Sequence, residues 1–176
     1  AVNYGAMGSV IGHELMHGFD DQGSKFDAQG NYVSWWGEQD RERFEARAKR
    51  LVEQFNRYVA IDGLHVNGEL TLGENIADLG GLLVAHDAFR TTRQAREGRP
   101  IDGLTPDQRF FLAYAQSWRR SYRPEALKLQ VNTDPHSPAN FRVIGPLSNM
   151  DSFARAFGCK DGDAMVSPVA TRVRIW

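Results

Sequence analysis

The 176-residue chain has 21 basic and 22 acidic residues, five histidines and a formal net charge of −1. This balance gives no excess of positive charge of the kind that binds nucleic acid or anionic membranes, so neither partner is expected. No apolar run approaches the roughly 18 residues that span a bilayer, so we expect no membrane contact from this segment. A single cysteine, Cys159, excludes an internal disulfide framework and a cysteine-based zinc site.

The first third of the chain predicts two helices separated by irregular structure. Ala1 opens a run of small residues that leads directly into a motif, and we expect the chain to be a piece of a larger protein. Residues 6–19 are expected to be helical, and residues 23–35 to form an irregular loop or small hairpin. Between residues 38 and 60, apolar side chains recur at helical spacing. This stripe comprises Phe44, Ala48, Leu51, Val52, Phe55, Tyr58 and Val59.

A long central helix is predicted after a glycine-rich loop at residues 61–70. Thr71 begins a T-x-x-E pattern, which predicts a capping box and a helix that runs to about Arg93. Gly80 and Gly81 each cost such a helix about 1 kcal/mol relative to alanine. A glycine pair inside a helix is easier to explain if another helix approaches closely there.

The last third predicts shorter helices around a rigid loop. After a linker at residues 98–103, further helix starts are predicted at Thr105–Pro106, at Pro124 and at Ser148. Gly158 is placed to end the last helix. Pro135 and Pro138 fix the backbone on both sides of His136. The whole pattern predicts a mainly α fold with little strand.

Residues 13–17 read His-Glu-Leu-Met-His and match the H-E-x-x-H pattern. Four residues make slightly more than one helical turn, so His13 and His17 leave one helix face, one above the other. Each imidazole can then place a nitrogen about 2.0–2.1 Å from one Zn²⁺. Glu14 lies beside this metal without binding it, where its carboxylate can take a proton from water. The alternative is a pair of satisfied core histidines at this spacing by chance.

A catalytic zinc needs a third protein ligand and an open fourth position. Glu74 and Asp78 are four residues apart and therefore share a helix face. Glu74 could bind the metal while Asp78 accepts the remaining N–H of a ligating histidine. The competing interpretation makes Glu74 the acidic partner in the Thr71 capping box. Other candidate ligands are His65, His86 and His136.

With both motifs in place, the chain resembles the neprilysin and endothelin-converting enzyme family of zinc peptidases. The resemblance runs through VIGHELMHGFDDQGSKFD, LTLGENIADLGG, SYRPE, DPHSPANFRVIGPLSN, FARAFGC and the terminal Trp176. It implies a zincin-like, thermolysin-related helical subdomain of the gluzincin type. Residues 1–176 would then be the C-terminal part of the catalytic domain of a larger two-domain peptidase. The upstream chain would carry a substrate-pairing strand and a helical lid.

The same resemblance implies roles for individual residues. His13, His17 and Glu74 would bind one Zn²⁺, Glu14 would be the general base, and Asp78 would orient a histidine ligand.

Four further residues receive roles from the resemblance alone. His136 matches the histidine that stabilises the oxyanion, and Arg142 matches the arginine that binds a substrate carbonyl oxygen. Without the resemblance, His136 could be a surface histidine and Arg142 a surface or salt-bridge arginine. Val10 and Trp118 align with residues that line the hydrophobic pocket for the side chain after the cleaved bond.

The expected function is a zinc-dependent endopeptidase that cuts short peptides on the amino side of hydrophobic residues. A different expectation is a zinc-binding scaffold that is catalytically incomplete as this isolated piece. A purely structural zinc site is disfavoured, because only three protein ligands are evident and Glu14 would have no purpose. The resemblance favours an extracytoplasmic enzyme, with a cytoplasmic one as the alternative.

Overall fold

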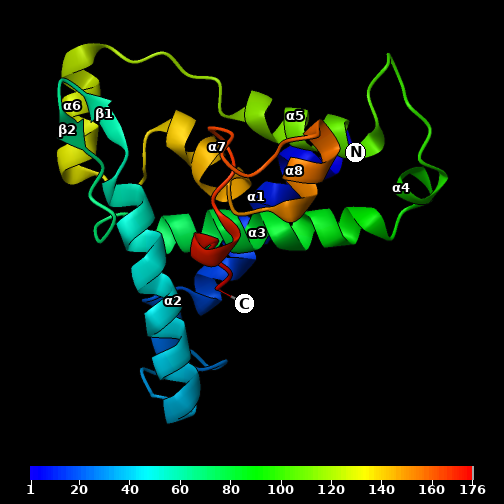
Figure 1. The fold of residues 1–176 in the computed structure, drawn as a ribbon. Coiled ribbons are helices and arrows are strands. Elements are labelled where there is room, and N and C mark those ends of the chain that lie inside the picture. The colour runs from blue at the N-terminus through cyan, green and yellow to red at the C-terminus, as the bar shows by residue number, and fades with distance from the viewer. Residues whose placement is uncertain (176) are drawn as a thin grey trace.

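The computed structural model describes residues 1–175; Trp176, one of the residues that carry the family resemblance, lies outside them. Most of the chain is helical (Figure 1), which confirms the predicted mainly α fold. The helices are α1 Ser9–Met16, α2 Glu38–Asn56, α3 Leu72–Arg90, α4 Arg93–Glu97, α5 Pro106–Ser117, α6 Pro124–Thr133, α7 Ala139–Leu147 and α8 Asp151–Phe157. A π-helical segment, Tyr4–Gly8, leads into α1, and 3-10 turns lie at His17–Phe19, Gly23–Lys25 and Val169–Thr171. No helix within residues 1–175 has the length and apolarity to cross a bilayer.

Helix α3 is the central element of the fold. It runs through the middle of the molecule, with α5, α7 and α8 on one side and α2 meeting its first turns (Figure 1). Every residue of α3 from Asn75 to Leu82 is buried. Two hydrophobic clusters meet along this helix. The first joins α3 to α2 and the C-terminal segment, and includes Leu51, Phe55 and Leu79. The second joins it to α5 and α8, and includes Leu82, Phe89 and Phe110.

Helix α1 packs along α3 at a pair of glycines. A Cβ atom on Gly81 would lie 2.3 Å from the backbone nitrogen of His13, and one on Gly12 would lie 2.4 Å from the Gly81 carbonyl oxygen. Only two residues without side chains allow this approach. The close helix contact expected from the Gly80–Gly81 pair is therefore present, and it fixes the first metal-motif histidine against α3.

Two local predictions differ from the structure in kind, and a third is shifted: the last helix, α8, begins at Asp151 and not at Ser148, because Ser148 ends α7. Helix α2 ends at Asn56 rather than near residue 60, because β1 (Val59–Ile61) pairs antiparallel with β2 (Leu64–His65) inside the predicted loop. Asp62 and Gly63 form the turn at φ 48° and 76°, and Asp-Gly is a strong hairpin signal. The small bridge between Phe26 and Tyr32 agrees with the hairpin alternative for residues 23–35.

The Thr71 capping box is the second difference. The Thr71 hydroxyl donates to the Asn67 carbonyl oxygen at 2.9 Å and accepts from the Asn75 amide at 2.9 Å, so it does not cap α3. Helix α3 nevertheless begins one residue later, at Leu72. At α5, by contrast, Thr105 and Gln108 form a complete capping box. Glu74 is thus free of the capping role that competed with metal binding.

Helix α7 was not predicted, although it carries a candidate site residue. Gly145 and Pro146 both disfavour a helix, so the sequence pattern did not predict this one. Pro146 lies in the last turn, and Gly145 packs so tightly that an added Cβ would stand 2.3 Å from the Phe55 ring. Pro138 precedes the helix in an extended conformation, as the predicted proline-bracketed loop requires.

Candidate metal centre

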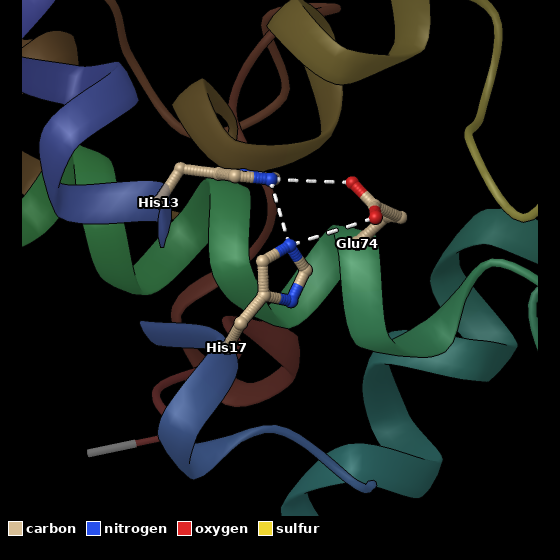
Figure 2. A group of neighbouring side chains, drawn as sticks. All are labelled: His13, His17 and Glu74. Atoms are coloured by element: carbon tan, nitrogen blue, oxygen red, sulfur yellow. Dashed lines mark hydrogen bonds and ion pairs between the residues drawn. The ribbon is translucent and has the colours of Figure 1, made fainter. Parts of the chain in front are cut away.

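Helix α1 and the turn after it present two histidines toward one residue of α3. Figure 2 shows the rings of His13 and His17 facing the carboxylate of Glu74. The two Nε2 atoms lie 3.0 Å apart. Glu74 Oε2 is 3.2 Å from His13 Nε2, and Glu74 Oε1 is 3.6 Å from His17 Nε2. All three side chains are partly shielded from solvent.

These three distances fit a shared metal ion. Ligand atoms held about 2.0–2.1 Å from a tetrahedral zinc stand about 3.3 Å from one another. The observed separations of 3.0, 3.2 and 3.6 Å scatter closely around that value. His13, His17 and Glu74 offer ligand atoms that all lie within 4.8 Å of one another. In the part of the chain that the structure describes, they form the one group of three or more His, Cys, Asp or Glu residues placed to hold a metal ion. Two nitrogens and one oxygen are a donor set that suits zinc.

Asp78 lies behind His13, on the side opposite the ligand nitrogen. Its Oδ1 is 2.8 Å from His13 Nδ1, and its side chain is 3% exposed. The N–H is not aligned with this oxygen, and Nδ1 has no well-directed hydrogen bond within the described residues. The close approach still has an electrostatic effect. Burial lowers the pKa of His13, but Asp78 and Glu74 outweigh it and raise that pKa to about 9.

His17 has its own carboxylate partner, which the sequence analysis did not single out. His17 Nδ1 and Asp20 Oδ2 are 2.7 Å apart. The other oxygen of Asp20 accepts the backbone N–H groups of Gln22 and Gly23, at 2.8 and 2.7 Å. Asp20 is buried and held from both ends. Its spacing of three residues after His17 was the available signal, because it places a carboxylate within one turn of the ring.

Arg142 and His136, which come from segments later in the chain, both contact the carboxylate of Glu74. Arg142, on α7, binds both oxygens of Asp78 at 2.7 and 2.8 Å and touches Glu74 Oε2 at 3.2 Å. It is 7% exposed, and its backbone carbonyl accepts the hydroxyl of Tyr114 at 2.6 Å. The structure therefore places Arg142 in a buried ion-pair network, not on the surface. Its Nη1 has no hydrogen bond within residues 1–175.

His136 Nε2 lies 3.2 Å from Glu74 Oε1, and its Nδ1 lies 2.7 Å from Asp134 Oδ1. The structure therefore brings a third imidazole to the edge of the cluster. Burial raises the pKa of Glu74, but His13, His136 and Arg142 outweigh it, so the net shift is downward. Glu74 is thus held ionised, the form that binds a metal.

Three predicted residues are less closely tied to the cluster. Glu14 is exposed on α1, and no hydrogen bond or ion pair engages its carboxylate in the described part of the chain. Trp118 ends α5, and its ring lies 4.2 Å from the guanidinium carbon of Arg142. Val10 is 44% exposed on α1 and does not line the cavities beside Trp118. His65 and His86, the other candidate ligands, lie outside the cluster.

Comparisons with known proteins show a family model and relatives that match nearly the whole chain. The chain matches the model of peptidase family M13 over residues 1–173. It is 47% identical to an endothelin-converting enzyme homolog from Locusta migratoria, over 100% of this chain and 24% of that protein. It is 45% identical to neprilysin-2 from Drosophila melanogaster, over 99% of this chain and 23% of that protein.

Solved structures agree in fold as well as in sequence. The crystal structure of Mycobacterium tuberculosis zinc metalloprotease Zmp1 in complex with an inhibitor superposes with a TM-score of 0.90 and 44% identity, over 99% of this chain and 28% of that one. The crystal structure of PepO from Lactobacillus rhamnosis gives a TM-score of 0.87 and 35% identity, over 99% and 26%. The chain thus spans about a quarter of the length of these relatives.

Proposed function

Because the chain belongs to peptidase family M13, we propose that the protein of which it is part is a zinc-dependent endopeptidase with its metal chemistry in residues 1–176. The observation that carries the proposal is the convergence of His13, His17 and Glu74 at the spacing of a tetrahedral zinc site. Short peptides cut on the amino side of hydrophobic residues are the proposed substrates. The names of the relatives support a peptidase that uses zinc.

His13, His17 and Glu74 would hold the metal, and Asp78 and Asp20 would hold the two histidine rings. Bound there, zinc would supply a Lewis acid that polarises the substrate carbonyl and acidifies a water. The ring of His17 is fixed by a 2.7 Å contact with Asp20, and such carboxylate–histidine pairs set both tautomer and ring orientation.

Glu14 is proposed as the general base. Its carboxylate is exposed and has no partner within the described residues, so it can accept a proton from the attacking water and return it to the leaving amine. The water oxygen forms a C–O bond to the carbonyl carbon, and the peptide C–N bond then breaks as the leaving amine takes up the proton. Arg142 keeps Nη1 for a substrate carbonyl oxygen, and His136 Nε2 can donate to the oxygen that gains charge during attack. Val10 and Trp118 are proposed to contact the side chain that follows the cleaved bond.

The substitution Glu14→Gln in the full-length protein tests this assignment. It keeps the size of the side chain and removes the base, so zinc content should stay at the parental level while peptide turnover falls by about 10²–10⁴-fold. Zinc measured by elemental analysis and kcat measured on one peptide give the two readouts. Turnover within tenfold of the parent at full zinc occupancy would contradict the role of Glu14.

The alternative proposal concerns residues 1–176 on their own, as a zinc-binding scaffold that is catalytically incomplete. It is favoured by exposed apolar side chains on the motif helix and on the π-helical segment before it: Met7, Ile11 and Leu15 are 62%, 57% and 61% exposed. Such a surface is typical of a face that other protein covers. Activity of residues 1–176 equal to that of the full-length protein would exclude this alternative. The extracytoplasmic location stays a prediction, which fractionation of cells that make the full-length protein would test.

A further inference from the structure

A polar cavity of about 340 Å³ adjoins the candidate metal centre. Its lining includes His136 and Arg142, which both contact Glu74, together with Trp118, Arg120 and Tyr122. Arg120 and Tyr122 lie in this lining but outside the cluster of candidate ligands. A peptide held at the cluster could therefore reach both of them.

Arg120 has no acidic partner in the described part of the chain. Its side chain is exposed, its guanidinium carbon lies 5.9 Å from the centroid of the Trp118 ring, and it has no hydrogen bond or ion pair within residues 1–175. Arg142, by contrast, already binds the carboxylates of Asp78 and Glu74. A guanidinium offers five N–H donors in a planar fork that matches a carboxylate. The N–H donors of Arg120 are therefore available to a ligand in this cavity.

Tyr122 adds a hydroxyl with a donor to spare. Its oxygen accepts the backbone N–H of Ala139 at 3.1 Å, which leaves its own proton for another acceptor. The nearby amide of Gln130 donates to the His136 carbonyl oxygen at 3.2 Å and is already used.

Among the described residues that line this cavity, Asp134 is the acidic one, and it already has a partner. One of its oxygens accepts the backbone N–H of His136 at 2.8 Å and lies 2.7 Å from Nδ1 of the same residue. The Asp134 carboxylate therefore positions His136, and it forms no ion pair with Arg120 within the described residues.

We propose that Arg120 and Tyr122 bind a carboxylate of the peptide, on the leaving-amine side of the cleaved bond, and so favour substrates that carry one there. The assignment to that side rests on the proposed function, because Trp118 is the residue placed beside the side chain that follows the cut. Two groups share this chemistry: the side chain of an aspartate or glutamate, and the free C-terminal carboxylate of a short peptide. Arg120 acts here as a specificity residue.

The test uses the zinc-loaded full-length protein and two matched sets of peptides. In one set, peptides that end soon after the cleaved bond carry either a free C-terminal carboxylate or an amide. In the other, amidated peptides carry Glu or Gln after the hydrophobic residue. We expect kcat/KM for the carboxylate member of at least one set to exceed that of its neutral match by about tenfold, mainly through KM. The set that responds identifies which carboxylate is bound.

Two substitutions separate Arg120 from its surroundings. Arg120→Ala should lower kcat/KM of the carboxylate member to that of its neutral match and so remove the preference. Arg119→Ala is the matched control, because Arg119 is also exposed but does not line this cavity, so it should keep the preference. Equal kcat/KM within each set for the parent, or an equal loss on both members in Arg120→Ala, would overturn the proposal.

Binding to the Glu14→Gln protein decides the question independently of turnover. The Kd of the carboxylate peptide should be about tenfold lower than that of its neutral match, and the two should become equal when Arg120→Ala is added. Matching Kd values before that change would reject the carboxylate site. If these Kd values differ but the parent cleaves no peptide, the endopeptidase proposal fails and the binding site stands.

Discussion

The contact between Gly12 and Gly81 predicts a substitution that harms the metal centre more than the fold. In Gly81→Ala, the new Cβ would start 2.3 Å from the backbone nitrogen of His13. Ordinary contact begins at about 3.4 Å, so α1 and α3 must separate locally by about 1 Å. Backbone atoms cannot rotate out of the way as a flexible side chain can. The displaced residue, His13, is itself a candidate ligand.

The magnitudes decide which property suffers most. Overpacking of this kind costs about 1–3 kcal/mol, and replacing a helical glycine by alanine returns about 1 kcal/mol. The net loss of unfolding free energy should therefore be about 0–2 kcal/mol, and the protein should still fold. A shift of about 1 Å in a catalytic group can lower activity by roughly 100-fold. Activity should fall far more than stability.

The assay compares Gly81→Ala with Gly8→Ala in the full-length protein. Gly8 precedes the same helix, but a Cβ there would meet its nearest atoms at 3.6 Å, which is ordinary contact. Thermal unfolding of the metal-free proteins, zinc titration and kcat/KM give the three measurements. Parental zinc affinity and kcat/KM in Gly81→Ala would refute the idea that this helix contact positions His13.

Three further substitutions test separate parts of the site and core. Glu74→Gln should lower zinc affinity by more than about 100-fold while changing the unfolding free energy of the metal-free protein by only about 1 kcal/mol, the usual net value of one hydrogen bond; parental zinc affinity would contradict its ligand role. Asp78→Asn should lower zinc affinity or activity roughly 10–100-fold and also destabilise the metal-free protein by about 3 kcal/mol, because Arg142 loses its bidentate partner in a buried setting; unchanged melting would contradict that second effect. His86 has a pKa that burial lowers more than Asp107 raises it, so the unfolded state takes up the proton first, and stability should decline as the pH falls below about 6.5. Unfolding free energies of the parent and His86→Gln at several pH values should diverge in this range, and a constant difference would refute the assignment.

Local sequence patterns predicted most of the helices and the two ligand-bearing motifs. The apolar stripe on α2 and the H-E-x-x-H spacing each depend on residues within a few turns of one another, and helical periodicity fixes their geometry. The end of α2 was wrong because the Asp62–Gly63 turn starts a hairpin that competes with the last helical turn. The Thr71 capping box was wrong because Asn67 and Asn75 offered its hydroxyl other partners.

The relations among distant segments were beyond such patterns. Arg142 lies 64 residues after Asp78, and no spacing rule predicts that the two form a buried bidentate pair. The helix that carries Arg142 was not predicted, because Gly145 and Pro146 both disfavour helices. The fold accommodates them because Gly145 packs against Phe55 of α2 and Pro146 lies in the last helical turn. Asp20 is the exception, since its distance of three residues from His17 made that contact accessible to local reasoning.

The central position of α3 has a thermodynamic consequence. Leu79 belongs to one hydrophobic cluster and Leu82 to the other, although they are neighbours on one helix. Helix α7 divides its apolar residues in the same way, with Phe141 in the first cluster and Leu147 in the second. Neither cluster can melt without disordering a helix that the other requires, so both should unfold in a single cooperative transition. A metal ion bound at Glu74 would then raise the melting temperature of the entire unit, including regions far from the ion.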